Sequence, residues 1–358
     1  MAGQLLIRSA LALTHRWLGG LVGLGLAMLG ISGTILLWKP WWVAVDQLPR
    51  AATAAETQAI IATVERLGAS YVTLPSPEFG VAQAGLSDGA GAYIAHDGRL
   101  LARWSSIWDR PETLLFDLHH HLLLGEAGAL FAGWLGLAAI LFAVTGLILW
   151  WPTRRTFRWR ALPARLTRPA ILRHHRDVGV VLALPIVLVA ATGALMVLKP
   201  LAALVLAPLS PAADVAEWQP KPPAPATPAA APNWPALLAS TRNRFPDAEL
   251  RILIWPKRPG DSVQIRMRQP AEWHPNGRTT LWLSAGGHIL LSRDALAAPL
   301  AVRTQNALYP LHAARMAGSR LSLPLRIVHS LAGLGLMLLG SMAVVSFWQS
   351  TFRGRGSA

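Results

Sequence analysis

The residues best suited to chemistry in this sequence are its eleven histidines, because the chain contains no cysteine. Without thiols a protein has no disulfides, zinc–thiolate sites, iron–sulfur clusters or thioether-linked haem, and imidazole becomes its main soft ligand. His15 and His175 stand in matching patterns, each followed by Arg at the next position and by Gly four positions on. A hydroxyl residue and a glycine then follow at the same offset, as Ser32-Gly33 and Thr192-Gly193. This repetition marks the two histidines as a pair.

The spacing also indicates what such a pair would hold. His15 and Gly33 are 18 residues apart, which is five full helical turns, so they share one face and lie about 27 Å apart. His175 and Gly193 have the same relation. Small residues on that face leave room for a flat, bulky group close to the backbone. Two histidines facing each other across a helical bundle suit bis-histidine haem b, which predicts an inner site ligated by His15 and His175.

A second planar site is expected at the opposite end of the bundle, with His119 and His312 as its ligands. Each helix that supplies a histidine to one haem would place a glycine beside the other haem. The glycines with these roles are Gly146 and Gly340 beside the inner site, and Gly33 and Gly193 beside the outer site.

The outer ligands have alternatives within the sequence. His329 competes with His312, since it lies about one turn inside the last apolar stretch and shares a helical face with Gly340. His120 or His121 can replace His119. A lone interfacial histidine is otherwise a helix cap or a headgroup contact. Three further histidines of the long connections are expected at solvated surfaces: His96, His274 and His288.

Four apolar stretches must position these histidines. The hydrophobic fraction is 53%, the charged fraction 14% and the mean hydropathy +0.38, whereas soluble domains carry about 25% charged residues. Each stretch is long enough to cross about 30 Å of hydrocarbon, which takes about 20 residues. Tryptophans stand at their ends, as in an interfacial aromatic belt. The predicted spans are Trp17–Trp38, Gly128–Trp151, Val178–Leu198 and Leu325–Trp348.

Arginines predict the orientation. The short connection 152–177 carries eight arginines and a single acid, Asp177. Arg8 and Arg16 precede the first span, and Arg353 and Arg355 follow the last. The positive-inside rule places these three segments in the cytoplasm of a bacterium and both long connections outside its inner membrane. The formal net charge of +15 follows largely from this bias, so a nucleic-acid partner is not expected and the lipid bilayer is.

The two long connections are expected to fold as small α+β domains. Each has a predicted helix, at Ala54–Leu67 and at Pro235–Phe245, and a predicted hairpin, at Tyr93–Arg103 and at Leu281–Arg293. Further strands are expected at Glu249–Trp255, Ser262–Gln269 and Thr279–Leu283. A proline- and alanine-rich stretch between Pro208 and Pro232 is typical of an extended tether. The predicted fold class is a membrane all-α four-helix bundle with two small α+β domains, built by internal duplication.

The predicted organisation of the chain is residues 1–38, first transmembrane helix; 39–127, first outer domain; 128–151, second helix; 152–177, arginine-rich cytoplasmic loop; 178–198, third helix; 199–324, second outer domain with its tether; and 325–358, fourth helix and cytoplasmic tail.

Taken together, these motifs resemble the PepSY-associated transmembrane proteins of bacterial inner membranes over nearly the whole chain. The matching segments are His15-Arg16-Trp17-Leu18-Gly19, Leu118-His119, Leu122-Leu123-Leu124-Gly125, Thr145-Gly146, His175-Arg176 with Gly179, and Leu311-His312. The resemblance implies two PepSY-like domains in the periplasm and b haems held by His15, His175, His119 and His312. This sequence departs from the family pattern at His312-Ala313-Ala314 and in the run His119-His120-His121.

The family includes iron-regulated proteins and ferric-siderophore reductases. The resemblance therefore implies a haem b oxidoreductase that carries electrons across the membrane to ferric-siderophore iron, with a cytoplasmic donor or quinol as reductant. Basic residues of the second outer domain are candidates for attracting an anionic chelate: Arg242, Arg244, Arg251, Lys257, Arg258, Arg266 and Arg268. Two alternatives need no haem. They are a PepSY membrane protein that binds or inhibits a periplasmic protease, and an accessory subunit of siderophore uptake.

Overall fold

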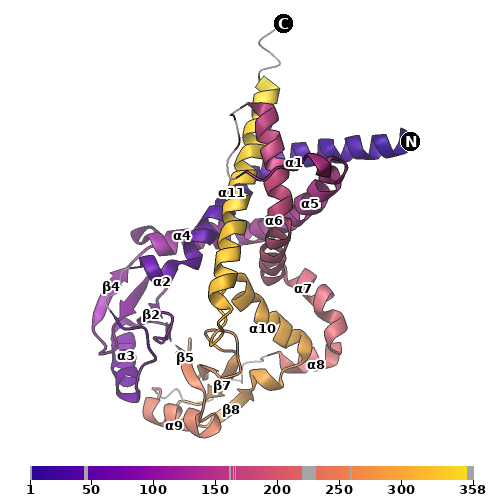
Figure 1. Ribbon diagram of the computed structural model, residues 1–358. Helices are drawn as coiled ribbons and strands as arrows, with labels where there is room; N and C mark the ends of the chain where they lie inside the picture. The colour runs from indigo at the N-terminus through magenta and orange to yellow at the C-terminus, as the bar shows by residue number, and fades with distance from the viewer. Residues whose placement is uncertain are drawn as a thin grey trace.

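Four long helices form one end of the molecule (Figure 1). A computed structural model describes residues 2–43, 47–160, 163, 165, 167–219, 231–258 and 260–352. The long helices are α1 (Ala2–Leu37), α5 (Gly125–Trp150), α6 (Arg168–Val197) and α11 (Ser322–Phe352). All four are long and apolar enough to cross a membrane, which confirms the four predicted spans. Helices α1 and α6 begin well before the predicted limits, so that His15 and His175 lie within helices.

The bundle is closed by close contact between neighbouring helices. Helix α1 packs against α11 and α5, and α6 packs against the same two helices, so α1 and α6 are diagonal. Glycines let α1 and α11 approach: a Cβ atom on Gly23 would lie 2.7 Å from the carbonyl oxygen of Gly340, and one on Gly333 would lie 2.7 Å from that of Gly30. Contacts this short exclude a side chain, which confirms that Gly23 and Gly333 are packing residues.

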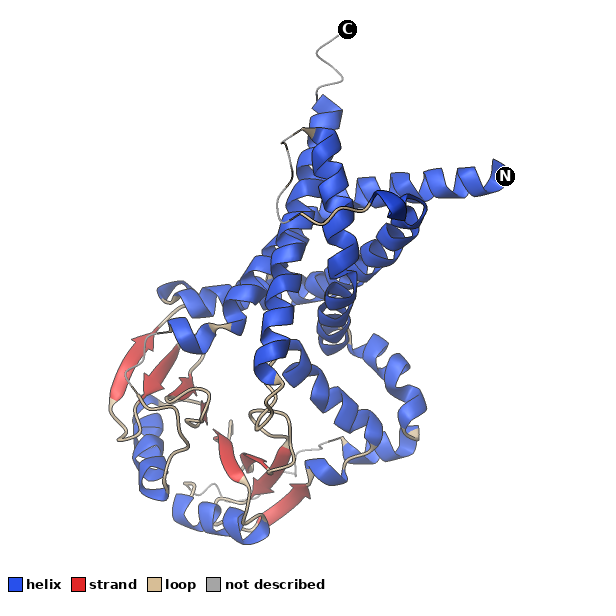
Figure 2. Ribbon diagram, viewed as in Figure 1, coloured by secondary structure: helices blue, strands red, loops and turns tan. Residues whose placement is uncertain are grey.

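The other end of the molecule holds one antiparallel sheet of eight strands in the described residues, in the order β4-β3-β2-β1-β5-β6-β7-β8 (Figure 2). The strands are β1 (Tyr71–Thr73), β2 (Ala82–Gly85), β3 (Gly91–Ile94), β4 (Leu100–Trp104), β5 (Glu249–Ile254), β6 (Val263–Arg268), β7 (Thr279–Leu283) and β8 (Ile289–Arg293). Each long connection contributes four strands and one preceding helix, α3 (Ala54–Leu67) or α9 (Trp234–Arg244). The predicted helices, hairpins and strands are all present.

The two sets of strands join edge to edge, which the sequence did not indicate. Val72 of β1 pairs with Leu253 of β5, and both side chains are fully buried in a core to which α3 and α9 also contribute. The indole of Trp234 donates a hydrogen bond to the carboxylate of Glu65 at 2.7 Å, which ties α9 to α3. The expectation of two separate outer domains is therefore corrected: their strands form one sheet over a shared core.

Short helices connect the sheet to the bundle. They are α2 (Lys39–Trp42), α4 (Pro111–His121), α7 (Lys199–Leu206), α8 (Ala212–Trp218) and α10 (Leu300–His312), with 3₁₀ helices at Ile107–Asp109, Ala207–Leu209 and Ala295–Ala297. A further 3₁₀ helix, Trp151–Thr156, follows α5. Helix α8 lies in the first part of the predicted tether, and residues 220–230 of that tether lie outside the described residues. The first turns of α1, the first turns of α6 and the last turns of α11 lie away from the sheet (Figure 1).

Candidate functional site: two histidine pairs in the bundle

The inner pair consists of His15 on α1 and His175 on α6, which face each other across the diagonal of the bundle. Their ring centroids are 6.3 Å apart and their planes are perpendicular. Both residues are half-buried. The structure thus brings together two histidines that are 160 positions apart in the sequence, as their matching motifs predicted.

The outer pair consists of His119 and His312, whose ring centroids are 6.1 Å apart with 36° between the planes. These residues lie on the short helices α4 and α10, which are separate from the spans α5 and α11 that follow them. Left-handed backbone at Leu122 (φ 50°) and Leu123 (φ 61°) ends α4 before α5 begins. The turn folds α4 back against both α1 and α5, and His119 thereby reaches the interior.

Both separations fit two imidazoles bound to one metal ion. Metal–imidazole nitrogen bonds are about 2 Å long, which places the centroids of two opposed rings about 6 Å apart. The described residues contain no cluster of three or more potential metal ligands among His, Asp and Glu. Within the described residues, each pair therefore offers two imidazole ligands.

Hydroxyl groups determine which nitrogen of each histidine ring carries the lone pair that can bind a metal. The Oγ1 of Thr145 donates to the carbonyl of Leu141 at 2.7 Å, so it accepts from the Nδ1 of His15 at 2.8 Å. In the same way Ser32 donates to the carbonyl of Met28 at 2.6 Å and lies 3.2 Å from the Nδ1 of His119. A ring with its proton on Nδ1 carries its lone pair on Nε2, which is the form that binds a metal.

The same arrangement recurs at the second outer histidine. Thr192 donates to the carbonyl of Leu188 at 2.8 Å and lies 3.2 Å from the Nδ1 of His312, which is also 3.1 Å from the carbonyl of Val189. His175 differs, because its hydrogen bond is to the backbone of Leu339. Three hydroxyl–glycine dipeptides thus orient three histidines. The sequence motif contained these hydroxyls, but they were not assigned this role.

Two of the predicted glycines make room for the histidine rings. A Cβ atom on Gly33 would lie 2.7 Å from Cε1 of His119, and one on Gly193 would lie 2.8 Å from Cε1 of His312. A Cβ atom on Gly146 would be 3.7 Å from Cε1 of His15, an ordinary contact. Gly340 lies against Gly23 of α1 instead. Gly340 therefore contributes to the packing of α11 on α1.

The alternative outer ligands have other partners. The ring of His120 stacks on Phe116 with 4.2 Å between centroids, and His121 forms an ion pair with Asp117 at 2.8 Å. The Nδ1 of His329 lies 3.1 Å from the carbonyl oxygen of His312, and its buried Nε2 has no hydrogen-bond partner. His329 thus holds the backbone of His312, while the ring of His312 faces His119.

The surroundings keep the outer rings neutral. Burial, with a smaller contribution from His312, lowers the pKa of His119 to about 3. Burial, with a smaller contribution from His329, lowers the pKa of His312 to about 4. A neutral imidazole is the form that ligates a metal.

The sequence and this geometry can be compared with known proteins. The profile of the PepSY-associated TM region matches residues 12–350. This chain belongs to the PepSY-associated TM family. A search of curated proteins finds no match to the chain. The family match spans all four long helices, the sheet and both histidine pairs of this PepSY-associated TM protein.

Several basic residues predicted to face a substrate have structural partners instead. Arg251 is buried, pairs with Glu249 at 3.0 Å and donates to the carbonyls of Pro75 and Pro275. Arg268 pairs with the same glutamate. Arg266 differs, because its buried Nε has no hydrogen-bond partner in the described residues. The expectation that His96 and His274 are solvated is wrong, since both are only 6% exposed.

Proposed function

We propose that this protein is a haem b reductase of the bacterial inner membrane that carries electrons across the bilayer to ferric-siderophore iron in the periplasm. The observation that carries the proposal is the pair of opposed histidines at each end of one bundle. Each pair has the spacing of axial haem ligands, and the Nδ1 of three of the four rings faces a hydroxyl oxygen.

The vertical separation of the sites supports transfer across a membrane. His15 belongs to the inner pair and Gly33, on the same helix, contacts the outer ligand His119. Eighteen helical residues separate these positions, which is about 27 Å and close to the hydrocarbon thickness of a bilayer. Haem b supplies reversible one-electron chemistry when it is bound. His15, His175, His119 and His312 would hold it and set its distance from each membrane surface.

Cationic residues between the outer pair and the sheet support an anionic substrate. Tyr309 lies one turn before His312 on α10, and the ring of His274 stacks on it with 4.9 Å between centroids. Burial, assisted by Arg278 and Arg266, lowers the pKa of His274 to about 2, so this ring stays neutral beside the guanidiniums. The buried Nε atoms of Arg266 and Arg278 have no partner within the described chain. Such groups favour a ferric chelate that carries negative charge.

The sidedness of the molecule supports the proposed topology. The start of α1, the end of α11 and the arginine-bearing first turns of α6 lie at the end opposite the sheet (Figure 1), as expected when that end is cytoplasmic and the sheet is periplasmic. The repeated order of helix, four strands, histidine helix and span supports an origin by internal duplication. A cytoplasmic donor or quinol would reduce the inner site.

An absorption spectrum of the detergent-purified protein tests the proposal. Sharp α and β bands after dithionite addition are expected for low-spin haem b, and a ferric hydroxamate should then reoxidise it. His15→Ala and His119→Ala should each remove one haem only. A protein that stays colourless after expression with ample haem would refute the reductase and leave the protease-binding and uptake-accessory functions.

A further inference from the structure

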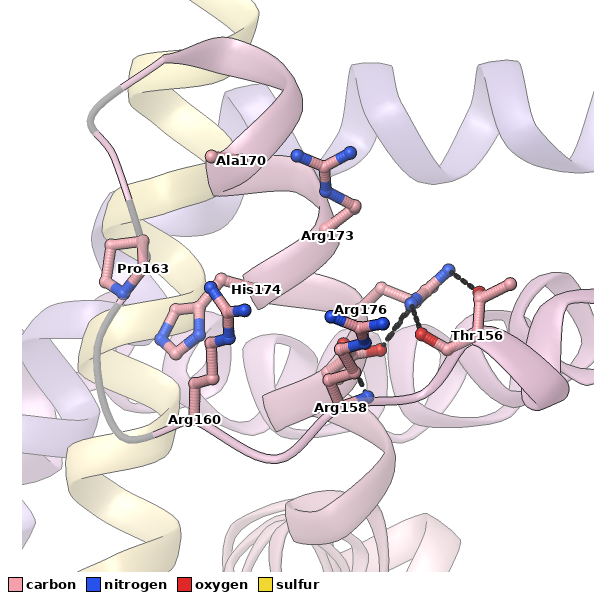
Figure 3. Close-up of a pocket in the computed structure, with 9 residues that line it drawn as sticks. Thr156, Arg158, Arg160, Pro163, Ala170, Arg173, His174 and Arg176 are labelled. Carbon is pink, nitrogen blue, oxygen red and sulfur yellow. Dashed lines mark hydrogen bonds and ion pairs between the residues drawn. The ribbon is translucent and has the colours of Figure 1, made fainter.

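A cleft at the end of the bundle remote from the sheet is lined by basic side chains (Figure 3). It has a volume of about 430 Å³ and lies between a segment that includes Thr156, Arg158, Arg160 and Pro163 and the first turns of α6. Four arginines and one aspartate are among its lining residues: Arg158, Arg160, Arg173, Arg176 and Asp177.

The single acid of this cleft is already neutralised. Arg176 pairs with Asp177 at 2.7 Å and also donates to the hydroxyl and the carbonyl of Thr156. Asp177 further accepts a hydrogen bond from the backbone of Arg158 at 3.3 Å. The guanidiniums of Arg158, Arg160 and Arg173 have no ion pair within the described residues, which leaves an excess of three positive charges around the cleft.

A buried imidazole in the same cleft lacks a partner. His174 is only 5% exposed, lines the cleft, and its Nε2 has no hydrogen-bond partner in the described chain. Figure 3 draws Arg160 and His174 at one end of the cleft and Arg158 with Arg176 at the other. An unsatisfied buried nitrogen is costly, so a ligand acceptor at this position is strongly favoured.

We propose that this cleft binds a phosphate group through Arg158, Arg160, Arg173 and His174. Guanidinium forks match phosphate oxygens in geometry and charge, and such charge-assisted hydrogen bonds are about twice as strong as neutral ones. A carboxylate has two oxygens that lie in one plane, so it reaches guanidiniums on different sides of a cleft less well. Phosphate has more oxygens and spreads them tetrahedrally. The group belongs either to a phospholipid headgroup or to a soluble phosphate compound.

The site lies directly beside the inner histidine pair, because His174 precedes His175 on α6. Phosphate binding nevertheless requires no haem, so it can be measured on haem-free and haem-loaded protein alike. Absence of phosphate binding would not contradict the proposed reductase, and absence of haem would not contradict the phosphate site.

Binding to the full-length protein in dodecyl maltoside, a detergent without phosphate, tests the site. One arm titrates inorganic phosphate and pyrophosphate by calorimetry, and the other counts co-purified phosphatidylglycerol by native mass spectrometry. Arg160→Gln and Arg173→Gln alter exposed side chains of the cleft. Arg155→Gln removes an exposed charge of the same segment that does not line the cleft, and serves as the matched control.

Loss of one charge-assisted contact should weaken binding about tenfold or more. Weaker phosphate binding in the two cleft variants but not in the control supports a soluble ligand. If bound phosphatidylglycerol is lost in the two cleft variants but not in the control, the ligand is a lipid headgroup. The proposal would be overturned if phosphate binding and bound phosphatidylglycerol were the same in the wild type, both cleft variants and the control.

Discussion

Replacing Gly33 or Gly193 with alanine should eject the outer haem while leaving the inner haem bound. The new methyl carbon would lie 2.7 Å from Cε1 of His119 or 2.8 Å from Cε1 of His312. Carbon atoms are most stable about 3.5–4.0 Å apart, so the ring must retreat by about 0.8 Å. Metal–ligand distances are held to about 0.2 Å. Ligation by the displaced histidine is therefore lost.

Gly146→Ala is the matched control, because its methyl carbon would meet His15 at 3.7 Å. All three glycines lie inside helices, where alanine adds up to about 1 kcal/mol of intrinsic helix stability. The two outer-site variants should lose haem in spite of that gain, whereas the control should retain both haems.

The assay is haem content per protein together with the low-spin signature by absorption and electron paramagnetic resonance. Unchanged low-spin haem in both Gly33→Ala and Gly193→Ala would refute the steric reasoning. The same conclusion would follow if Gly146→Ala lost as much haem as they did.

Three further predictions concern ligand support and pH. Thr145→Val should weaken haem binding at the inner site by about 10-fold to 100-fold. Ser32→Ala should weaken haem binding at the outer site by a smaller factor, because His119 also lies 3.2 Å from the carbonyl of Leu29. Haem titration of the two purified variants compares these effects. His312→Ala should abolish the outer low-spin signal and His329→Ala should retain it, and the opposite pattern in their spectra would make His329 the ligand. Burial lowers the pKa of Lys39 from 10.5 to about 8, so the native state binds fewer protons between these values and stability should rise with pH across that window. In thermal unfolding experiments, the stability of Lys39→Met should rise less with pH than that of the wild type. If the two proteins show the same rise in stability, Lys39 is not its source.

The features predicted most accurately from the sequence were those governed by local pattern. The helix at Ala54–Leu67 was placed at its observed limits, where a capping box of Thr53 and Glu56 marks its start and Gly68 (φ 64°) its end. The spans followed from length and hydropathy. His15 and His175 were paired from their motifs, and the structure places their rings opposite each other.

The features that were missed depend on tertiary context. Leu122 and Leu123 adopt left-handed backbone, which leucine disfavours, so the types of these two residues did not indicate that α4 would end there. The pairing of β1 with β5 joins strands from different halves of the chain, and such pairing leaves no periodic signal.

The seam between β1 and β5 has a consequence for biosynthesis. While the first half of the chain emerges, β1 has no partner on the side that β5 will later cover, and His119 has no opposing ring. An unpaired strand edge is prone to misassociation, and contacts between distant segments form late. The strand seam and the opposed rings of His119 and His312 can therefore form only after β5 and α10 have been made. A truncated chain that ends before β5 should require chaperone protection.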